Sequence, residues 1–354
     1  METTVLKNIL KSENEAIIIS SETNRRYFTE FPASDGFLVI TKEKAVFFTD
    51  SRYIEAAGLK CKDCETALLT RVSEEIKKYF EENKITKVLT ERERLTVSEL
   101  SLLKKAIPMC RVTPSLSVEN AVDKVRSVKT EYEVENIIKA QRIAEDAFSH
   151  ILGFIKPGVT EKEIGLELDF YMLSHGAEAL SFETIAVTGK KSSMPHGVPD
   201  GNKVKNGDFI TMDYGATVNG YHSDMTRTVA VGKVTSEQKK VYSTVLEAQL
   251  KSLEILKEGI TGFDGDKAAR DVIENAGYGK YFGHGTGHGV GVEIHEKPNV
   301  STRAKTKLKA GNIVTVEPGI YIPGKFGVRI EDMALITKGG CKNLTKAPKE
   351  LIIL

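Results

Sequence analysis

The strongest constraint on the fold is a predicted hairpin in residues 208–231, DFITMDYGATVNGYHSDMTRTVAV. β-Type residues stand on both sides of Asn219-Gly220, the dipeptide that most favours a two-residue type I′ turn. With this turn, Asp213 pairs with Thr226. Side chains alternate between the two faces of a sheet, so Asp224 lies on the same face as Asp213 and diagonal to it. The hairpin therefore predicts two carboxylates that face one point.

A second strand pair with two acids is predicted in residues 312–337, NIVTVEPGIYIPGKFGVRIEDMALIT. Strand-like residues flank a turn at Pro323-Gly324-Lys325, where proline and glycine favour chain reversal. Glu317 and Glu331 stand equally far from position 324. These two carboxylates are therefore also expected to lie across a hairpin from each other.

Two similar hexamers indicate that the second part of the chain is duplicated. IKPGVT at 155–160 and LKEGIT at 256–261 are 101 residues apart, and each lies between two helical segments. Thr130-Glu-Tyr-Glu133 and Thr160-Glu-Lys-Glu163 have the spacing of capping boxes at helix starts. Each half of the duplication then contributes one strand pair with two acids.

Four carboxylates brought together repel, and burying them unpaired is costly, so a cation is expected among them. The stretch 283–296, GHGTGHGVGVEIHE, adds three imidazoles. Its glycines fit neither G-x-G-x-x-G nor G-K-[ST], and its glycine content and the absence of a following glutamate exclude a zincin helix. Acids with imidazoles fit two divalent ions that share carboxylates and activate water for hydrolysis. The glycines are expected to let the backbone pass close to metal and substrate.

Length and charge limit the classes of function. A chain of 354 residues with 40% hydrophobic residues has room for about two domains. Fifty basic and forty-nine acidic residues give a net charge of +1, so no field attracts nucleic acid or an anionic membrane. The first residues lack the apolar core of a signal peptide, and no apolar run reaches the roughly 20 residues of a membrane span. We therefore expect a cytoplasmic protein with neither nucleic acid nor membrane as partner.

The composition changes near residue 120. Before it, strand-like runs such as FLVI at 37–40 and AVFFTD at 45–50 alternate with charged helical stretches, as in an α/β layer domain. Residues 111–130 carry proline, serine and charge without a clear period. The predicted domains are 1–122 and 123–354.

Four segments of the second domain occur in this order: SFETIAVTGKKSSMPHG (181–197), TMDYGATVNGYHSDMTRT (211–228), GHGTGHGVGVEIHE (283–296) and VTVEPGIYIPGKFGVRIED (314–332). Together they resemble the pita-bread metallopeptidases, and among these the Xaa-Pro peptidases, aminopeptidase P and prolidase. NRRYFTEFPASDGFLVITKEKAVFFTDSRYIEAA (24–57) resembles the creatinase/prolidase N-terminal domain. The resemblance implies an α/β N-terminal domain of that type and an α+β pita-bread catalytic domain with an internal pseudo-twofold duplication.

The resemblance also implies roles for individual residues. Asp224 and Glu331 bridge two metal ions, Asp213 completes one ion, and His288 with Glu317 completes the other. Glu317 also accepts a proton from the bridging water. The complete implied ligand set is Asp213, Asp224, His288, Glu317 and Glu331.

Four further residues are implied to meet the substrate. His196 and His295 contact the scissile carbonyl or stabilise the tetrahedral intermediate. His284 lines the substrate pocket, and Arg329 orients ligands or binds a substrate carboxylate. The donor chemistry suits this assignment, because a developing oxyanion needs a Lewis acid and a hydrogen-bond donor.

The expected activity is hydrolysis of the Xaa-Pro bond at the N-terminus of peptides, with a metal-bridged hydroxide as nucleophile. Manganese is favoured among the possible ions, with cobalt, zinc or iron as alternatives, and the resemblance implies a homodimer. A prolidase restricted to dipeptides is the main alternative. Some prolidases carry an arginine shortly after the His-Glu-x-Pro run to grip the substrate carboxylate, and here that position is Asn299, which favours the aminopeptidase.

Three other functions fit the sequence less well. A methionine aminopeptidase shares the metal site but usually lacks the N-terminal domain. Metal-independent creatine hydrolysis and a binding protein without metals both fit poorly, because all five ligand positions hold competent residues.

Overall fold

The computed structural model describes residues 3–61 and 63–354. The chain divides into two compact units, Met1–Val125 and Arg126–Leu354. Among the described residues, no helix is both long enough and apolar enough to cross a bilayer.

The first unit is built on one six-stranded sheet with the order β4-β3-β2-β1-β5-β6. All its neighbouring pairs are parallel except those of β2, which runs antiparallel to β1 and β3. The strands are β1 (Glu15–Ile19), β2 (Phe37–Ile40), β3 (Ala45–Thr49), β4 (Glu65–Leu68), β5 (Lys87–Thr90) and β6 (Arg111–Pro114). The helices are α1 (Thr4–Lys7), α2 (Glu22–Thr29), α3 (Ile54–Lys60), α4 (Val72–Glu82), α5 (Val97–Ala106) and α6 (Leu116–Ser127), which ends at the start of the second unit.

Strands β1, β2 and β3 of the first unit are mostly apolar because both of their faces are buried. Ile17, Ile18 and Ile19 of β1 are all fully buried, as expected for a strand with both faces covered. On one face, Ile76 and Phe80 of α4 pack into the same apolar cluster as Ile18. The α/β layer predicted for this part of the chain is therefore present.

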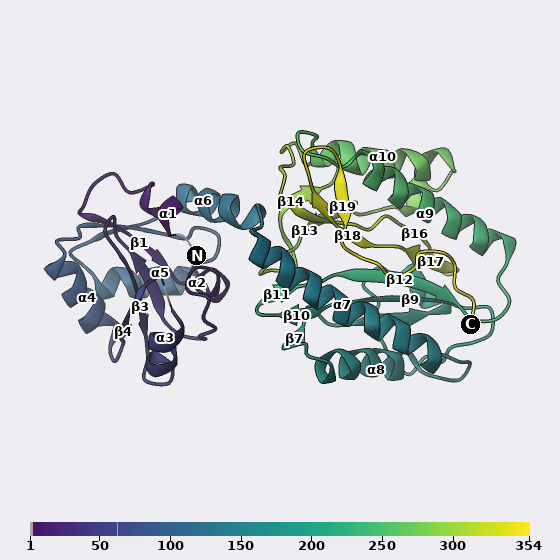
Figure 1. The fold of residues 1–354 in the computed structure, drawn as a ribbon, viewed down its shortest axis with the longest axis horizontal. Helices are drawn as coiled ribbons and strands as arrows, with labels where there is room; N and C mark the ends of the chain where they lie inside the picture. The colour runs from purple at the N-terminus through teal and green to yellow at the C-terminus, as the bar shows by residue number, and fades with distance from the viewer. Residues whose placement is uncertain (1–2, 62) are drawn as a thin grey trace. The chain divides into compact units, whose positions relative to one another are not determined.

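The second unit holds its strands between two helix pairs, as Figure 1 shows. The helices are α7 (Glu131–Phe154), α8 (Glu161–Ser174), α9 (Ser236–Ile255) and α10 (Gly262–Asn275), with short 3-10 turns η1 (Gly189–Ser193) and η2 (Gly279–Tyr281). The first half contributes β7 (Ala179–Leu180), β8 (Ile185–Thr188), β9 (Phe209–Tyr214), β10 (Ala216–Val218), β11 (Tyr221–His222) and β12 (Met225–Ala230). The second contributes β13 (Gly287–Gly289), β14 (Glu296–Val300), β15 (Ile313–Val316), β16 (Gly319–Ile322), β17 (Phe326–Arg329), β18 (Asp332–Ile336) and β19 (Cys341–Asn343).

These strands form separate small sheets rather than one large one. Their orders are β12-β9-β8, β11-β10-β7, β14-β13-β15-β18-β19 and β16-β17. Ala144 and Phe148 of α7 pack in one apolar cluster with Met212 of β9, whereas Val245 of α9 packs in another with Val328 of β17. Each helix pair therefore packs into its own apolar cluster, and β9 and β12 contribute residues to both clusters.

The two predicted halves repeat the same local contacts. Thr160 and Thr261, at equivalent positions of the two hexamers, each form a capping box, and each makes an isolated β-bridge, to Lys203 and Lys307 respectively. The duplication predicted from the hexamers is therefore visible in the backbone. The box at Thr261 has an aspartate, Asp264, where the sequence pattern requires glutamate or glutamine, and it was missed for that reason.

The first carboxylate hairpin has the predicted register. Asn219 has a positive φ of 50°, and Asp213 pairs with Thr226. The hairpin changes sheets midway, at Gly215, so its turn end and its acid end belong to different sheets. A β-carbon at Gly215 would lie 1.9 Å from the carbonyl oxygen of Ser223, and only glycine allows this close approach.

The second hairpin is also symmetric about position 324. Ile320 pairs with Val328 in one sheet, and Val316 pairs with Asp332 in the next. Glu317 and Glu331 lie at the junction between these two ladders, one on each strand. Asp224, Glu317 and Glu331 thus lie where a strand passes from one sheet to another, whereas Asp213 lies inside β9, two residues before Gly215.

The repeated capping boxes give a test of the duplicated frame. Thr160→Ala and Thr261→Ala should each lower the free energy of unfolding by about 1 kcal/mol, because each removes an acceptor for an orphan backbone N–H. Urea unfolding, together with hydrogen exchange of the Glu163 and Asp264 amides, measures the loss. Thr302→Ala, in an exposed loop, is the control. Unchanged midpoints and unchanged exchange in both cap variants would contradict the assignment.

Candidate metal centre

All nine residues singled out in the sequence line one cavity of about 590 Å³ in the second unit. Both halves of the duplication contribute to it. They are His196, Asp213, Asp224, His284, His288, His295, Glu317, Arg329 and Glu331.

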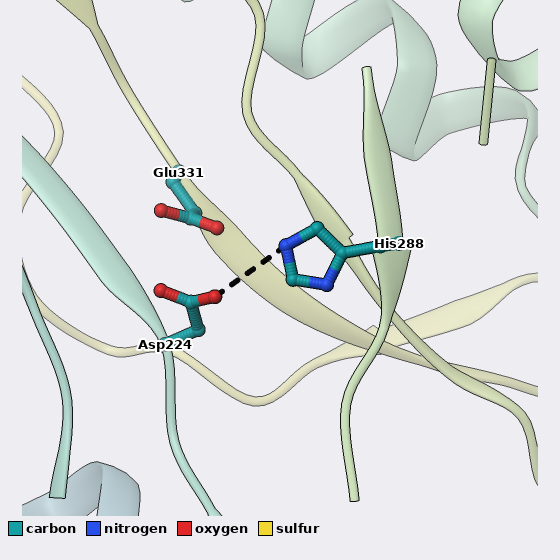
Figure 2. Close-up of side chains that lie close together, drawn as sticks. All are labelled: Asp224, His288 and Glu331. Atoms are coloured by element: carbon teal, nitrogen blue, oxygen red, sulfur yellow. Dashed lines mark ion pairs between the residues drawn. The ribbon is translucent and has the colours of Figure 1, made fainter. Parts of the chain in front are cut away.

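The centre of the site is formed by two carboxylates and one imidazole. One donor atom each from Asp224, His288 and Glu331 lie within 4.8 Å of one another. Figure 2 shows the two carboxylates side by side with the His288 ring facing them. His288 Nε2 lies 3.6 Å from Asp224 Oδ2 and 3.3 Å from Glu317 Oε1. These distances leave room for an ion between the groups.

Two buried oxygens in this group lack partners. Within the described chain, Asp213 Oδ1 and Glu331 Oε1 are buried and accept no hydrogen bond. Burial, followed by repulsion from neighbouring carboxylates, raises the pKa of Asp224 and of Glu331 well above the usual range. Unpartnered oxygens on acids that resist ionisation fit a bound cation, and this donor set of oxygens with one imidazole suits divalent ions.

Glu317 and His288 form an ion pair in which each group shifts the pKa of the other. Burial opposes charge on both, but their hydrogen bond and mutual attraction outweigh it. The pKa of Glu317 falls to about 2 and that of His288 rises to about 9. His288 Nδ1 donates to the carbonyl oxygen of Gly289, 3.1 Å away, which fixes the ring so that Nε2 faces the carboxylates.

Arg329 is committed to protein partners. Its Nη2 donates to Asp213 Oδ2 at 2.6 Å, and its Nε donates to Thr226 Oγ1 at 2.9 Å. The Thr226 hydroxyl in turn donates to Glu331 Oε2 at 2.7 Å. Arg329 therefore orients two of the acids, which is one of the two functions expected for it. The part played by Thr226 was not foreseen from the sequence.

His284 is held by a chain of hydrogen bonds. Its Nδ1 donates to the carbonyl oxygen of Gly285 at 2.8 Å, and its Nε2 accepts from the hydroxyl of Tyr321 at 3.0 Å. That hydroxyl accepts from Arg329 Nη1 at 2.8 Å. Burial lowers the pKa of His284, so the ring is neutral in this arrangement. His284 thus lines the cavity through contacts that fix its tautomer.

The other two histidines lie at the cavity wall. The His295 ring centroid is 4.2 Å from that of His288, in an edge-on arrangement. His196 follows η1 and lines the same cavity. The structure thus brings both residues to the carboxylate group, as a role in substrate contact requires.

The glycines on both sides of His288 are required by close contacts between strands. A β-carbon at Gly287 would lie 2.0 Å from the carbonyl oxygen of Thr315, and one at Gly289 would lie 2.7 Å from that of Glu296. These glycines let β13 approach its neighbours β15 and β14. Gly285 and Gly287 also line the cavity, so the expectation that glycines of this stretch pass close to metal and substrate stays a prediction.

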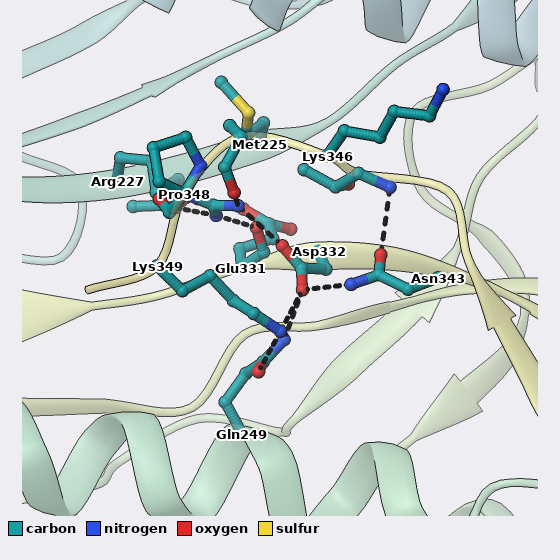
Figure 3. A network of polar contacts seen from close by, with 12 residues as sticks. Met225, Arg227, Gln249, Glu331, Asp332, Asn343, Lys346, Pro348 and Lys349 are labelled. Carbon is teal, nitrogen blue, oxygen red and sulfur yellow. Dashed lines mark hydrogen bonds and ion pairs between the residues drawn. The ribbon is translucent and has the colours of Figure 1, made fainter.

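A buried polar network lies behind Glu331 (Figure 3). Arg227 Nη1 donates to the carbonyl oxygen of Glu331 at 2.5 Å, and its Nη2 donates to Asp332 Oδ1 at 2.8 Å. Lys349 Nζ donates to Asp332 Oδ2, also at 2.8 Å. Gln249 and Asn343 donate to that same oxygen. The network fixes the backbone that carries Glu331.

Comparison with known proteins agrees with this geometry. Residues 135–338 match the model of metallopeptidase family M24, and residues 4–128 match the creatinase/prolidase N-terminal domain. The chain belongs to metallopeptidase family M24. An uncharacterized peptidase, YqhT, of Bacillus subtilis is 42% identical, and the match covers 96% of each chain.

Solved structures of similar chains have the same fold. An Xaa-Pro dipeptidase from Bacillus anthracis superposes with a TM-score of 0.92 at 44% identity, over 96% of this chain and 95% of that one. An X-Pro aminopeptidase from Thermotoga maritima gives a TM-score of 0.90 at 36% identity, over 96% and 97% of the chains. The predicted creatinase-type N-terminal domain, pita-bread catalytic domain and metal-dependent peptidase class are confirmed for this M24 protein.

The raised pKa values predict how the metal-free protein responds to pH. A carboxyl whose folded pKa exceeds its unfolded pKa, about 4.3, stabilises the fold at low pH and loses that contribution as pH rises through the folded value. Asp224 and Glu331 therefore both lower the free energy of unfolding as the pH rises above about 5. The pKa of His288 is raised to about 9, so its stabilising contribution is also lost as the pH rises above its ordinary pKa. Burial lowers the pKa of His284 and of His295, so these two rings add stability as the pH rises towards about 6.5. We therefore expect stability to fall from about pH 7 to 8.5, where only the carboxyls and His288 act.

Thermal unfolding after chelation measures this slope. Manganese at a hundred times its Kd should flatten the slope and add about 2.7 kcal/mol at neutral pH. Glu331→Gln should give a shallower slope without metal and a smaller gain with it. A metal-free protein whose stability rises over this range would contradict the account.

Proposed function

We propose that this M24 protein is an Xaa-Pro aminopeptidase, which hydrolyses the bond before proline at the N-terminus of peptides. The observation that carries the proposal is the convergence of four acids and His288 on one cavity that also holds His196 and His295. Similar proteins named Xaa-Pro dipeptidase and X-Pro aminopeptidase support the choice of bond.

The proposed cofactor is a pair of divalent ions, with manganese favoured over cobalt, zinc or iron. Asp213, Asp224, His288, Glu317 and Glu331 would hold them. Asp224, His288 and Glu331 would form the core of this set, because one donor atom of each lies within 4.8 Å of the others. Such ions supply a Lewis acid and lower the pKa of a bound water molecule.

The side chains around the ions have separate tasks. Glu317 is proposed to accept the proton of the attacking water, since its carboxylate lies in the cavity wall beside His288. His295 and His196 are proposed to donate hydrogen bonds to the oxygen of the scissile carbonyl as it gains charge. The proline nitrogen leaves poorly until it is protonated, so the proton taken by Glu317 is passed to it.

The charges of the cavity favour peptides longer than dipeptides. Among the described residues that line it there is no lysine, and Arg329 is the one guanidinium. Each of its nitrogens already donates to the protein, to Thr226, Tyr321, Pro195 or Asp213. The carboxylate of an Xaa-Pro dipeptide therefore meets no uncommitted cation there. A dipeptidase is the second candidate, because the similar Bacillus anthracis protein carries that name.

Product release from an Xaa-Pro dipeptide and from an Xaa-Pro-Xaa tripeptide tests the proposal in the presence of manganese. We expect a higher kcat/KM for the tripeptide, and no turnover of either substrate by Glu317→Ala. Asn299→Arg should lower KM for the dipeptide alone, because it places a cation at the cavity wall, and Asn299→Gln is the matched control. Cleavage of dipeptides only would establish the dipeptidase. Cleavage of neither by metal-loaded protein would contradict both candidates.

A further inference from the structure

His295 is an exposed residue in a bent segment that lies outside the regular strands. It belongs to the His295 loop, defined as residues 290–296, which bends before β14 begins at Glu296. At its first end the amide of His222 donates to the carbonyl oxygen of Gly291 at 2.9 Å. That contact lies four residues before His295, so it does not by itself fix the imidazole.

The other end is held by charge. The Glu296 side chain is 5% exposed and lies between two cations whose side chains are 3% and 0% exposed, Arg126 and Lys129. Arg126 Nη2 donates to Glu296 Oε2 at 2.6 Å, and Lys129 Nζ donates to Glu296 Oε1 at 2.6 Å. Arg126 Nη2 also donates to Glu293 Oε2 at 2.7 Å, inside the loop. We call Arg126, Lys129, Glu293 and Glu296 the ion clamp.

The ion clamp is balanced in charge, with two acids and two bases. Burial opposes ionisation of Glu296, but Lys129 and then Arg126 outweigh it and hold the pKa of Glu296 below its usual range. Removing one member of a buried pair leaves an uncompensated charge, which costs far more than losing an exposed pair. The loop therefore has one strongly preferred position.

The cations are themselves held by backbone contacts that do not involve the loop. The Lys129 amide donates to the carbonyl oxygen of Gly311, and Asn312 Nδ2 donates to that of Ser127, both at 2.8 Å. Substitution of the Lys129 side chain leaves these two contacts in place. The ion clamp thus joins an independently anchored segment to the His295 loop.

Glu331 has a similar support. Both His295 and Glu331 immediately precede a strand whose first residue is an acid, Glu296 of β14 and Asp332 of β18. Asp332 is held by Arg227 and Lys349, as Glu296 is held by Arg126 and Lys129. His295 and Glu331 lie just before these strands, and each is joined by one peptide bond to the anchored acid, so fixing the acid restricts where its neighbour can lie.

We propose that Arg126 and Lys129 are positioning residues for His295, acting through Glu296. The proposal rests on the role in catalysis proposed for His295. Both cations precede residue 135, where the match to the M24 family model begins. The catalytic arrangement therefore includes a segment that precedes the region matched to the M24 model.

A double-mutant cycle separates positioning from general stability. Lys129→Met should lower kcat about tenfold to a hundredfold with KM and metal content unchanged, because a catalytic group is misplaced. In a His295→Ala background, itself about a hundredfold slower, Lys129→Met should change kcat less than twofold. Lys251→Met, which removes an exposed lysine paired with Glu254, should have no effect in either background. Equal losses in both backgrounds, or no loss in either, would overturn the proposal.

Hydrogen exchange of the metal-free protein gives a readout that does not depend on turnover. Lys129→Met should speed exchange of the amides in residues 290–296 while leaving α9 unchanged. If His295→Ala keeps wild-type kcat, the catalytic role of His295 fails, whereas unchanged loop exchange in Lys129→Met means that the clamp itself fails. If Lys129→Met does not fold, Glu293→Gln takes its place as the test. This substitution removes the charge of the more exposed acid of the ion clamp, and should give smaller effects of the same kind. An absence of these smaller effects in folded Glu293→Gln would then count against the proposal.

Discussion

Repulsion among four carboxylates that line one cavity, two of them buried, is the constraint on which the rest of the catalytic unit depends. Asp213, Asp224, Glu317 and Glu331 line one cavity, and the fold brings them there from two hairpins. No arrangement of apolar residues could hold these charges together, because burial and proximity both oppose ionisation. In the duplicated frame, strand pairing holds the backbone that carries these acids in place. Asp224, Glu317 and Glu331 lie where strands leave one sheet for another, and Asp213 is paired inside β9, so the strand ladders set the positions of all four acids.

Protein cations complete the support without entering the centre of the site. Arg329 pairs with Asp213, and two further pairs of cations hold Asp332 and Glu296, the neighbours of Glu331 and His295. Buried ion pairs of this kind contribute little net stability, since the cost of removing charges from water offsets their attraction. Their value here is geometric. Each fixes one orientation of a strand end, and with it the direction of the residue that faces the cavity.

Much of this arrangement follows from local sequence. The Asn219-Gly220 turn determines the pairing of Asp213, and symmetry about position 324 places Glu317 opposite Glu331. Both results depend on the alternation of side chains along a strand and on the residue types at the turn. A short segment of sequence contains all of this information.

The buried ion networks could not be predicted in the same way. Arg227 and Asp332 are 105 residues apart, and Arg126 and Glu296 are 170 apart, so no local pattern joins them. The available signal was an acid directly after a site residue, in the Glu331-Asp332 and His295-Glu296 pairs, but an acid at a strand end is usually solvated. The homodimer and the cytoplasmic location stay predictions from the sequence.

Metal stoichiometry is the most direct measure of the central claim that the four carboxylates hold two cations. Chelated protein titrated with manganese under calorimetry, with the bound metal counted by elemental analysis, should take up two ions per chain. Asp224→Asn should bind fewer and more weakly, because it removes an acid from the centre of the group. Wild-type protein that saturates at one ion, or binds none at millimolar manganese, would contradict the account.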